Sequence, residues 1–134
     1  MKEKIFNPKE TFTFPVKIEG KKISDTFISA WEGGSSYWCS CAKMEFPKGY
    51  RKKSSFPSQQ AYECIVSGGT LYMEDKEEDK KFQVSGGQAK IEQTLKIMAE
   101  KHVKHFADLV NGTDDAITAD VFFQLLCFGE LIYG

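Results

Sequence analysis

The sequence has little of what several protein classes require. Its 134 residues hold 18 lysines and arginines against 19 aspartates and glutamates, a formal net charge of -1. The broad positive field of a nucleic-acid-binding protein is therefore missing. No apolar run is long enough to cross a bilayer, and residues 1–5 lack the apolar stretch of a signal peptide. We expect a cytoplasmic protein without a membrane or bulk nucleic-acid partner.

Groups for catalysis and metal binding are equally sparse. The chain has two histidines, His102 and His105, and four cysteines, of which only Cys39 and Cys41 lie close together. One intervening residue is too few for the turn of a usual zinc knuckle, and no helix follows these thiols at once to lower their pKa. We therefore expect free thiols, no metal, no cofactor and no catalytic residue. A small metal-dependent hydrolase using the aspartates and histidines is the alternative enzymatic interpretation.

The hydrophobic pattern predicts one α+β domain over residues 1–134. Alternation at 11–18 predicts an edge strand in the N-terminal region 1–23, and three further strands are predicted at 37–46, 70–74 and 81–84. Helical spacing predicts helices over 24–33, 57–67, 85–111 and from residue 118 onward. The pair Gly33 and Gly34 is the predicted C-cap of the first helix. We expect a small antiparallel sheet packed against about four helices.

One segment differs from the rest in charge. Residues 47–58 contain the basic cluster Arg51, Lys52 and Lys53 among proline, glycine and serine residues, which favour an exposed loop. Cations in such a loop can meet an acidic protein surface. We predict a partner-binding role for these three side chains.

The C-terminal segment 115–134 combines an acidic helix start with a helix that is apolar nearly all round. Carboxylates at a helix start are stabilised by its free amides and its dipole. A helix with so little polar surface must be covered by the rest of the domain or by another subunit. The residues predicted to have a structural or homo-oligomer role are Asp115, Thr118, Asp120, Phe122, Gln124, Phe128 and Tyr133.

A second patch, residues 32–38, offers groups suited to a flat, polar ligand. Two flexible glycines and two hydroxyls precede two adjacent aromatic residues, which point to opposite faces if a strand has begun. An aromatic ring would stack on a base, while the hydroxyls would bind phosphate or ribose. The alternative is that the tryptophan belongs to the core and the glycines cap a helix. The predicted binding residues are Glu32, Gly33, Gly34, Ser35, Ser36, Tyr37 and Trp38.

These two patches also carry a resemblance. The motifs are Ala30-Trp31-Glu32-Gly33-Gly34-Ser35-Ser36-Tyr37-Trp38 and Asp115-Ala116-x-Thr118-Ala119-Asp120-x-Phe122-x-Gln124-x-x-x-Phe128-Gly129-Glu130-x-Ile132-Tyr133-Gly134. In them the chain resembles a family of small proteins encoded by tailed bacteriophages and prophages. The similarity spans residues 24–134. The chain departs from the pattern by its basic insertion at 50–53 and by its N-terminal strand.

The resemblance implies a phage or prophage accessory protein in the cytoplasm of a bacterial host. By analogy with other small phage proteins, such a protein antagonises a defence system without catalysis. Its partner would be a host defence protein, such as a CRISPR effector, or a nucleotide second messenger that it sequesters. A structural module of the replication or packaging machinery is the remaining alternative.

Overall fold

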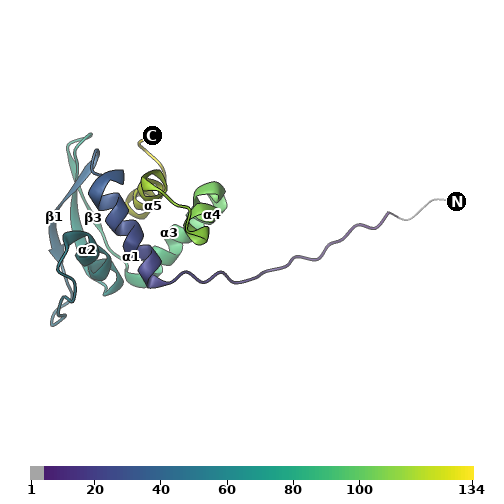
Figure 1. Cartoon of the computed structure of the whole chain (residues 1–134), viewed down its shortest axis with the longest axis horizontal. Helices are drawn as coiled ribbons and strands as arrows, with labels where there is room; N and C mark the ends of the chain where they lie inside the picture. Colours follow the sequence, from purple (N-terminus) through teal and green to yellow (C-terminus); the bar gives the residue numbers. More distant parts are fainter. Residues whose placement is uncertain (1–4) are drawn as a thin grey trace.

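The computed structural model describes residues 5–134 and has the α+β fold that the sequence predicts (Figure 1). Within this part of the chain there are five α-helices, one π-helical turn and three strands. The helices are α1 (Gly20–Ser29), α2 (Pro57–Val66), α3 (Gly87–Lys101), α4 (Val103–Asn111) and α5 (Ala116–Phe128). The π-helical turn is η1 (Ala30–Gly34), and the strands are β1 (Cys39–Glu45), β2 (Thr70–Asp75) and β3 (Lys80–Val84).

The strands form one antiparallel sheet with β2 in the centre and the order β1-β2-β3. The charged turn between β2 and β3 closes the predicted hairpin, with Asp75 paired to Lys80. The register between β1 and β2 shifts between Cys41 and Lys43, a bulge that leaves Ala42 without a paired residue in β2. On β2 the buried residues Leu71, Met73 and Asp75 alternate with half-buried ones, so one face of the sheet packs against the helices.

Helix α5 lies at the centre of the domain. Nine consecutive residues, 118–126, are buried, as expected for a helix that is apolar nearly all round. Phe122 and Phe123 pack edge to face against Phe27 of α1, and Phe123 also meets Trp31 of η1. The chain's own elements therefore cover α5, and no second subunit is needed to bury it.

The helices differ from the prediction in two places. The helix predicted over 85–111 is divided at His102, whose non-helical backbone (φ -134°, ψ 56°) separates α3 from α4 and lets each pack separately against α5. Helix α1 begins at Gly20, one turn before the predicted cap Ser24. The domain consequently has five helices where four were predicted. Within residues 5–134 the longest helix has 15 residues, and none is long and apolar enough to cross a membrane.

The predicted N-terminal strand is wrong over the described part of region 1–23. Residues 5–19 run as an extended chain away from the domain and form no strand (Figure 1). The pattern is right for an extended chain, but a strand also needs a neighbour for its backbone hydrogen bonds, and Pro15 has no N–H to donate. Residues 1–4 lie outside the described part.

Candidate functional site

The two motif patches meet at the buried carboxylate of Asp120 on α5. Its Oδ1 accepts hydrogen bonds from the Ser35 hydroxyl (2.7 Å) and the Trp38 indole N–H (2.8 Å). Its Oδ2 accepts from the Tyr37 hydroxyl (2.8 Å) and the Gln124 side-chain amide (2.9 Å). None of these four donors carries a charge, so dipoles alone replace the water that the carboxylate lost on burial. Asp120 is thus the centre of a polar network in the core and not the helix-start carboxylate that the sequence predicts.

The network continues from Gln124 to the C-terminal segment. The side-chain oxygen of Gln124 accepts from the backbone N–H groups of Ile132 and Tyr133, both at 2.9 Å, and its amide donates to the Tyr133 carbonyl at 3.0 Å. The Tyr133 hydroxyl then donates to the Asp75 carboxylate at the end of β2. These contacts fasten the segment after α5 against the sheet, which supports the structural role predicted for Gln124 and Tyr133.

Burial of Trp38 corrects part of the predicted ligand site. The indole is fully buried and packs against Phe82, Phe128 and Tyr133, so neither of its faces is open for a base to stack on. Ser35 is 1% exposed and gives its hydroxyl hydrogen to Asp120, so it has none left for a phosphate. Trp38 and Ser35 belong to the network that holds η1 against α5.

Tyr37 is more exposed than Trp38, although both lie in the turn before β1, where the alternation of strand side chains does not apply. It is 46% exposed, while its hydroxyl reaches back to Asp120. Burial of the hydroxyl, and then the hydrogen bond to Asp120, raise the pKa of Tyr37 to about 12. The ring is accessible, but Tyr37 does not line the pocket described below.

The glycine pair does not cap a helix. Gly33 and Gly34 lie inside η1, where the Ser35 N–H bonds to the Ala30 carbonyl five residues earlier at 2.8 Å. A Cβ on Gly34 would lie 2.5 Å from the backbone oxygen of Ala116, whereas one on Gly33 would meet nothing within 4 Å. Gly34 is therefore required for the close approach of η1 to the start of α5, and the resulting π-helical turn places Ala30 and Trp31 opposite the sheet.

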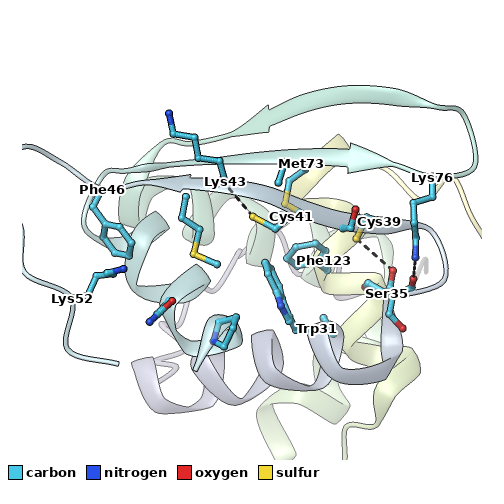
Figure 2. A pocket seen from close by; sticks show the side chains of 17 residues that line it. Trp31, Ser35, Cys39, Cys41, Lys43, Phe46, Lys52, Met73, Lys76 and Phe123 are labelled. Carbon is cyan, nitrogen blue, oxygen red and sulfur yellow. Dashed lines mark hydrogen bonds between the residues drawn. The ribbon is translucent and has the colours of Figure 1, made fainter. Parts of the chain in front are cut away.

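A pocket of about 620 Å³ lies between β1 on one side and η1, the start of α2 and Phe123 of α5 on the other (Figure 2). This volume is within the range of small-molecule sites, roughly 300–1,000 Å³. Its apolar lining includes Trp31, Met44, Phe46, Met73 and Phe123. The polar residues around it are Ser35, Ser36, Ser40, Gln60, Lys43, Lys52 and Lys76, and Cys39, Ser40, Cys41 and Ala42 provide its β1 wall.

The pocket is electropositive. Three of its lining residues are lysines, and no aspartate or glutamate of residues 5–134 lines it. Lys52 lies at one end beside Phe46, and Lys76 lies at the other, with Trp31 between the two ends (Figure 2). The Lys76 ammonium donates to the Ser36 carbonyl, while the Lys52 ammonium lies 5.8 Å from the centroid of the Phe46 ring. Lys43 points away, over the Tyr72 ring on the outer face of the sheet.

The basic loop is held in place by one carboxylate. Glu63 of α2 accepts from the Tyr50 hydroxyl (2.8 Å) and from the backbone N–H groups of Lys53 (2.7 Å) and Ser54 (3.0 Å). Burial opposes ionisation of Glu63, but these hydrogen bonds outweigh it and hold its pKa below the usual value. The loop is exposed, as predicted, and it brings only Lys52 of the basic cluster to the pocket; Arg51 lies outside it.

The thiols and imidazoles do not form a reactive or metal-binding group. Burial, and then the nearby Asp120, raise the pKa of Cys39 to about 12, and burial raises the pKa of Cys41. These protonated thiols are poor nucleophiles. His105 contacts the Thr118 hydroxyl at 3.0 Å through Nδ1, and burial is the main cause that lowers the pKa of His102. Within residues 5–134, no three His, Cys, Asp or Glu side chains are placed to hold a metal ion.

The start of α5 confirms one predicted cap. Asp115 is the N-cap, and its carboxylate accepts from the Thr118 backbone N–H at 2.9 Å. This hydrogen bond is the main cause that lowers the pKa of Asp115. The neighbouring Asp114 instead forms an ion pair with Lys22 of α1.

Comparison of the chain with protein-family models, with curated proteins and with solved structures finds no match. The site must therefore be interpreted from its own geometry. Of the predicted binding residues, Ser35, Ser36 and Lys52 line the pocket, whereas Glu32, Gly33, Gly34, Tyr37, Trp38, Arg51 and Lys53 do not.

Four important pocket residues were not predicted: Trp31, Met44, Gln60 and Lys76. Trp31 precedes the glycine pair by two residues, and this position is a usable signal in the sequence. Lys76 lies in a charged hairpin turn and Gln60 in an ordinary helix start. Nothing local in the sequence marks them, because the pairing of β1 with β2 and the packing of α2 against these strands bring them to the same space.

Proposed function

We propose that this protein is a non-enzymatic binding protein whose sheet–helix pocket takes a small nucleotide. The observation that supports the proposal is the pocket's combination of an aromatic and thioether lining with ammonium groups at both ends and no lining carboxylate from residues 5–134. A base can pack against Trp31 and the methionines, while phosphates at the two ends meet Lys52 and Lys76. Ser36, Ser40 and Gln60 add neutral hydrogen-bonding groups.

The spacing of the cations favours a ligand with more than one phosphate position. Lys52 and Lys76 lie at opposite ends of the pocket, so one phosphate cannot serve both equally well (Figure 2). A nucleoside 3′,5′-bisphosphate or a cyclic dinucleotide carries two phosphates on a scaffold of flat bases. We therefore expect tighter binding for such compounds than for a 5′-mononucleotide.

The biological role in this proposal is that of a phage or prophage accessory protein that sequesters a nucleotide second messenger of a host defence system. The resemblance in the two motif patches supports the origin, and the pocket supports the ligand class. Sequestration requires binding without turnover, which agrees with pocket thiols whose raised pKa makes them poor nucleophiles.

Calorimetric titration of the full chain tests the proposal. The probes are a nucleoside 3′,5′-bisphosphate, a cyclic dinucleotide, a 5′-mononucleotide and an uncharged nucleoside, each at low and high salt. We expect affinity to rise with phosphate number and to weaken with salt. Equal, salt-independent binding of the uncharged nucleoside, or no binding by any probe, would refute the proposal. Mass spectrometry of the recovered probe must show it unchanged, since conversion would favour the hydrolase alternative.

Three lysine variants provide matched controls. Lys52→Gln and Lys76→Gln each remove a cation at one end of the pocket, and each should weaken the bisphosphate by about tenfold, the loss expected for one charged hydrogen bond. Lys43→Gln removes a cation of the same pocket wall whose ammonium points to the outer face. It should leave the affinity within about twofold of wild type. Equal losses in all three would mean that only general charge attracts the ligand.

A protein target is the second candidate, and the ordered basic loop supports it. Glu63 fixes the loop, and Arg51 and Lys53 are exposed outside the pocket, where they can meet an acidic surface of a host defence protein. Pull-down from host lysate with wild type and with Arg51→Gln/Lys53→Gln separates the two candidates. A partner that is lost with this pair, from a protein that binds none of the nucleotides, would favour the protein target.

A further inference from the structure

The extended N-terminal arm, residues 5–18, carries a row of apolar side chains that the domain leaves uncovered. Phe6 is 83% exposed, Phe12 85% and Phe14 77%, and Ile5 and Val16 are also exposed. Phe12, Phe14, Val16 and Ile18 occupy every second position, so their side chains share one face of the extended chain. Pro15 is one of the intervening residues. Large apolar groups in such a row indicate an interaction surface.

An apolar groove of about 600 Å³ lies where this arm joins the domain. Val16 and Ile18 form its near end, and helices α1, α2, α3 and α4 provide the rest of its lining. Its apolar residues include Ile23, Tyr62, Ile91, Leu95, Ala99 and Phe106. The groove shares no lining residue with the lysine-containing pocket. It therefore represents a separate surface.

We propose that the arm of one copy of this chain lies in the groove of a second copy, and that the exchange is reciprocal. Each chain has one arm that needs cover and one groove that can provide it, which is the requirement for a two-fold symmetric contact. The arm leaves the domain at Val16 and Ile18 and does not turn back along its own groove (Figure 1). Val16 and Ile18 thus line the groove of their own chain, and the apolar face of the arm continues outward from them toward Phe12 and Phe6.

The size of the contact is sufficient for a specific dimer. An aromatic side chain buries roughly 150–250 Å², so three phenylalanines from each of two arms supply on the order of 900–1,500 Å². This range includes the roughly 1,000 Å² needed for a specific interface. Charge does not oppose the contact, because the arm carries Lys9, Glu10 and Lys17 and the groove carries both Glu92 and Lys96.

The test is the mass of the full chain in solution, measured by light scattering and native mass spectrometry over a range of concentrations. We expect a dimer for wild type and a twofold lower mass for Phe12→Asp/Phe14→Asp. The matched control is Thr11→Asp/Thr13→Asp, which places the same charges on the opposite face of the same segment and should remain dimeric. Both double variants alter exposed residues outside the folded domain, so the fold is preserved.

Mixing two variants locates the binding surface. Phe12→Asp/Phe14→Asp keeps an intact groove, and Ala99→Arg, which fills the groove, keeps an intact arm. A mixture should form heterodimers at concentrations where neither variant dimerises alone, because one arm-to-groove contact is restored. Loss of the dimer without such rescue would mean that the arms pair with each other and would overturn the groove assignment.

Two other results would also overturn the proposal. A wild-type protein that stays monomeric at every concentration excludes the second copy as occupant. In that case, protection of the arm from proteolysis would show that it folds back into its own groove, and recovery of a different protein through the arm would show a heterologous partner. A dimer that persists in Phe12→Asp/Phe14→Asp would place the dimer interface elsewhere. Neither result affects the nucleotide titrations, which depend on other residues.

Discussion

Replacing Asp120 with asparagine tests whether the buried network holds the two motif patches together. The substitution keeps the size and shape of the side chain and removes its charge. The carboxylate accepts four hydrogen bonds at 2.7–2.9 Å, two at each oxygen. Asparagine has one oxygen, which can keep the Ser35 and Trp38 donors. Its NH₂ group then faces the Tyr37 hydroxyl and the Gln124 amide.

The cost of this change follows from the two donors that lose their acceptor. The Tyr37 hydroxyl lies at the edge of the core and can turn to water, so its loss is small. The Gln124 amide is buried and keeps only its bond to the Tyr133 carbonyl and a long contact with Tyr37. A hydrogen bond to a charged group contributes roughly 1.5–3 kcal/mol, and removing the buried charge returns part of this. We expect Asp120→Asn to lower the free energy of unfolding by about 1–3 kcal/mol.

Urea unfolding, followed by tryptophan fluorescence and by circular dichroism, measures the effect. The midpoint should fall with an unchanged m-value, since the surface exposed on unfolding is the same. Glu130→Gln, a charge removal at an exposed position of the same motif, should stay within about 0.5 kcal/mol of wild type. In a double-mutant cycle, Asp120→Asn and Trp38→Phe should show a coupling of roughly 1 kcal/mol or more. A change below about 0.5 kcal/mol for Asp120→Asn, or no coupling, would refute the idea that this carboxylate organises the core.

Three further predictions concern stability. Gly34→Ala should cost about 1–3 kcal/mol because its Cβ would press on the Ala116 carbonyl, whereas Gly33→Ala should be neutral or slightly stabilising in thermal unfolding. Asp115→Ala should cost about 1 kcal/mol through loss of the N-cap, most of which Asp115→Asn should restore in the same assay; equal losses would exclude capping as the cause. Folding raises the pKa of Cys39 from 9.0 to about 12, so the unfolded chain releases this proton at a lower pH than the folded protein does. The free energy of unfolding should therefore fall as the pH rises from 9.0 toward about 12. Urea titrations at increasing pH should show a shallower fall for Cys39→Ala.

The sequence supports prediction of those elements whose pattern is set by local burial. The hairpin of β2 and β3, helix α2 after Pro57 and the N-cap at Asp115 all follow from short-range rules of turn and capping chemistry, and they are observed. The arm shows where such rules fail. Alternation specifies an extended conformation at residues 11–18, but pairing depends on a neighbour that the sequence pattern alone does not provide. The break at His102 likewise reflects the packing of α3 and α4 on α5 and not a local breaker residue.

The candidate site could be predicted only in part, for a related reason. Aromatic residues, hydroxyls and glycines distinguish residues 32–38 in the sequence, yet the role of Ser35 and Trp38 depends on a carboxylate about 85 positions later in the chain. Once Asp120 is placed beside them, Ser35 and Trp38 become donors in the core. The lysines at the two ends of the pocket, Lys52 and Lys76, come from two loops with no shared motif. Prediction of the pocket would have required the register of β1 on β2, which shifts at the bulge after Cys41.

The division between network and pocket leads to a last prediction. The residues around Asp120 stabilise the fold, whereas Lys52 comes from the exposed basic loop. If stability and recognition are separate in this way, Lys52→Gln should weaken the bisphosphate about tenfold and leave the urea midpoint unchanged, because Lys52 is exposed and forms no ion pair within residues 5–134. Asp115→Ala should lower the midpoint and leave the affinity unchanged, since Asp115 does not line the pocket. Loss of both properties in both variants would mean that the ligand site and the core form one cooperative unit, and the basic loop could then not set ligand choice independently of the fold.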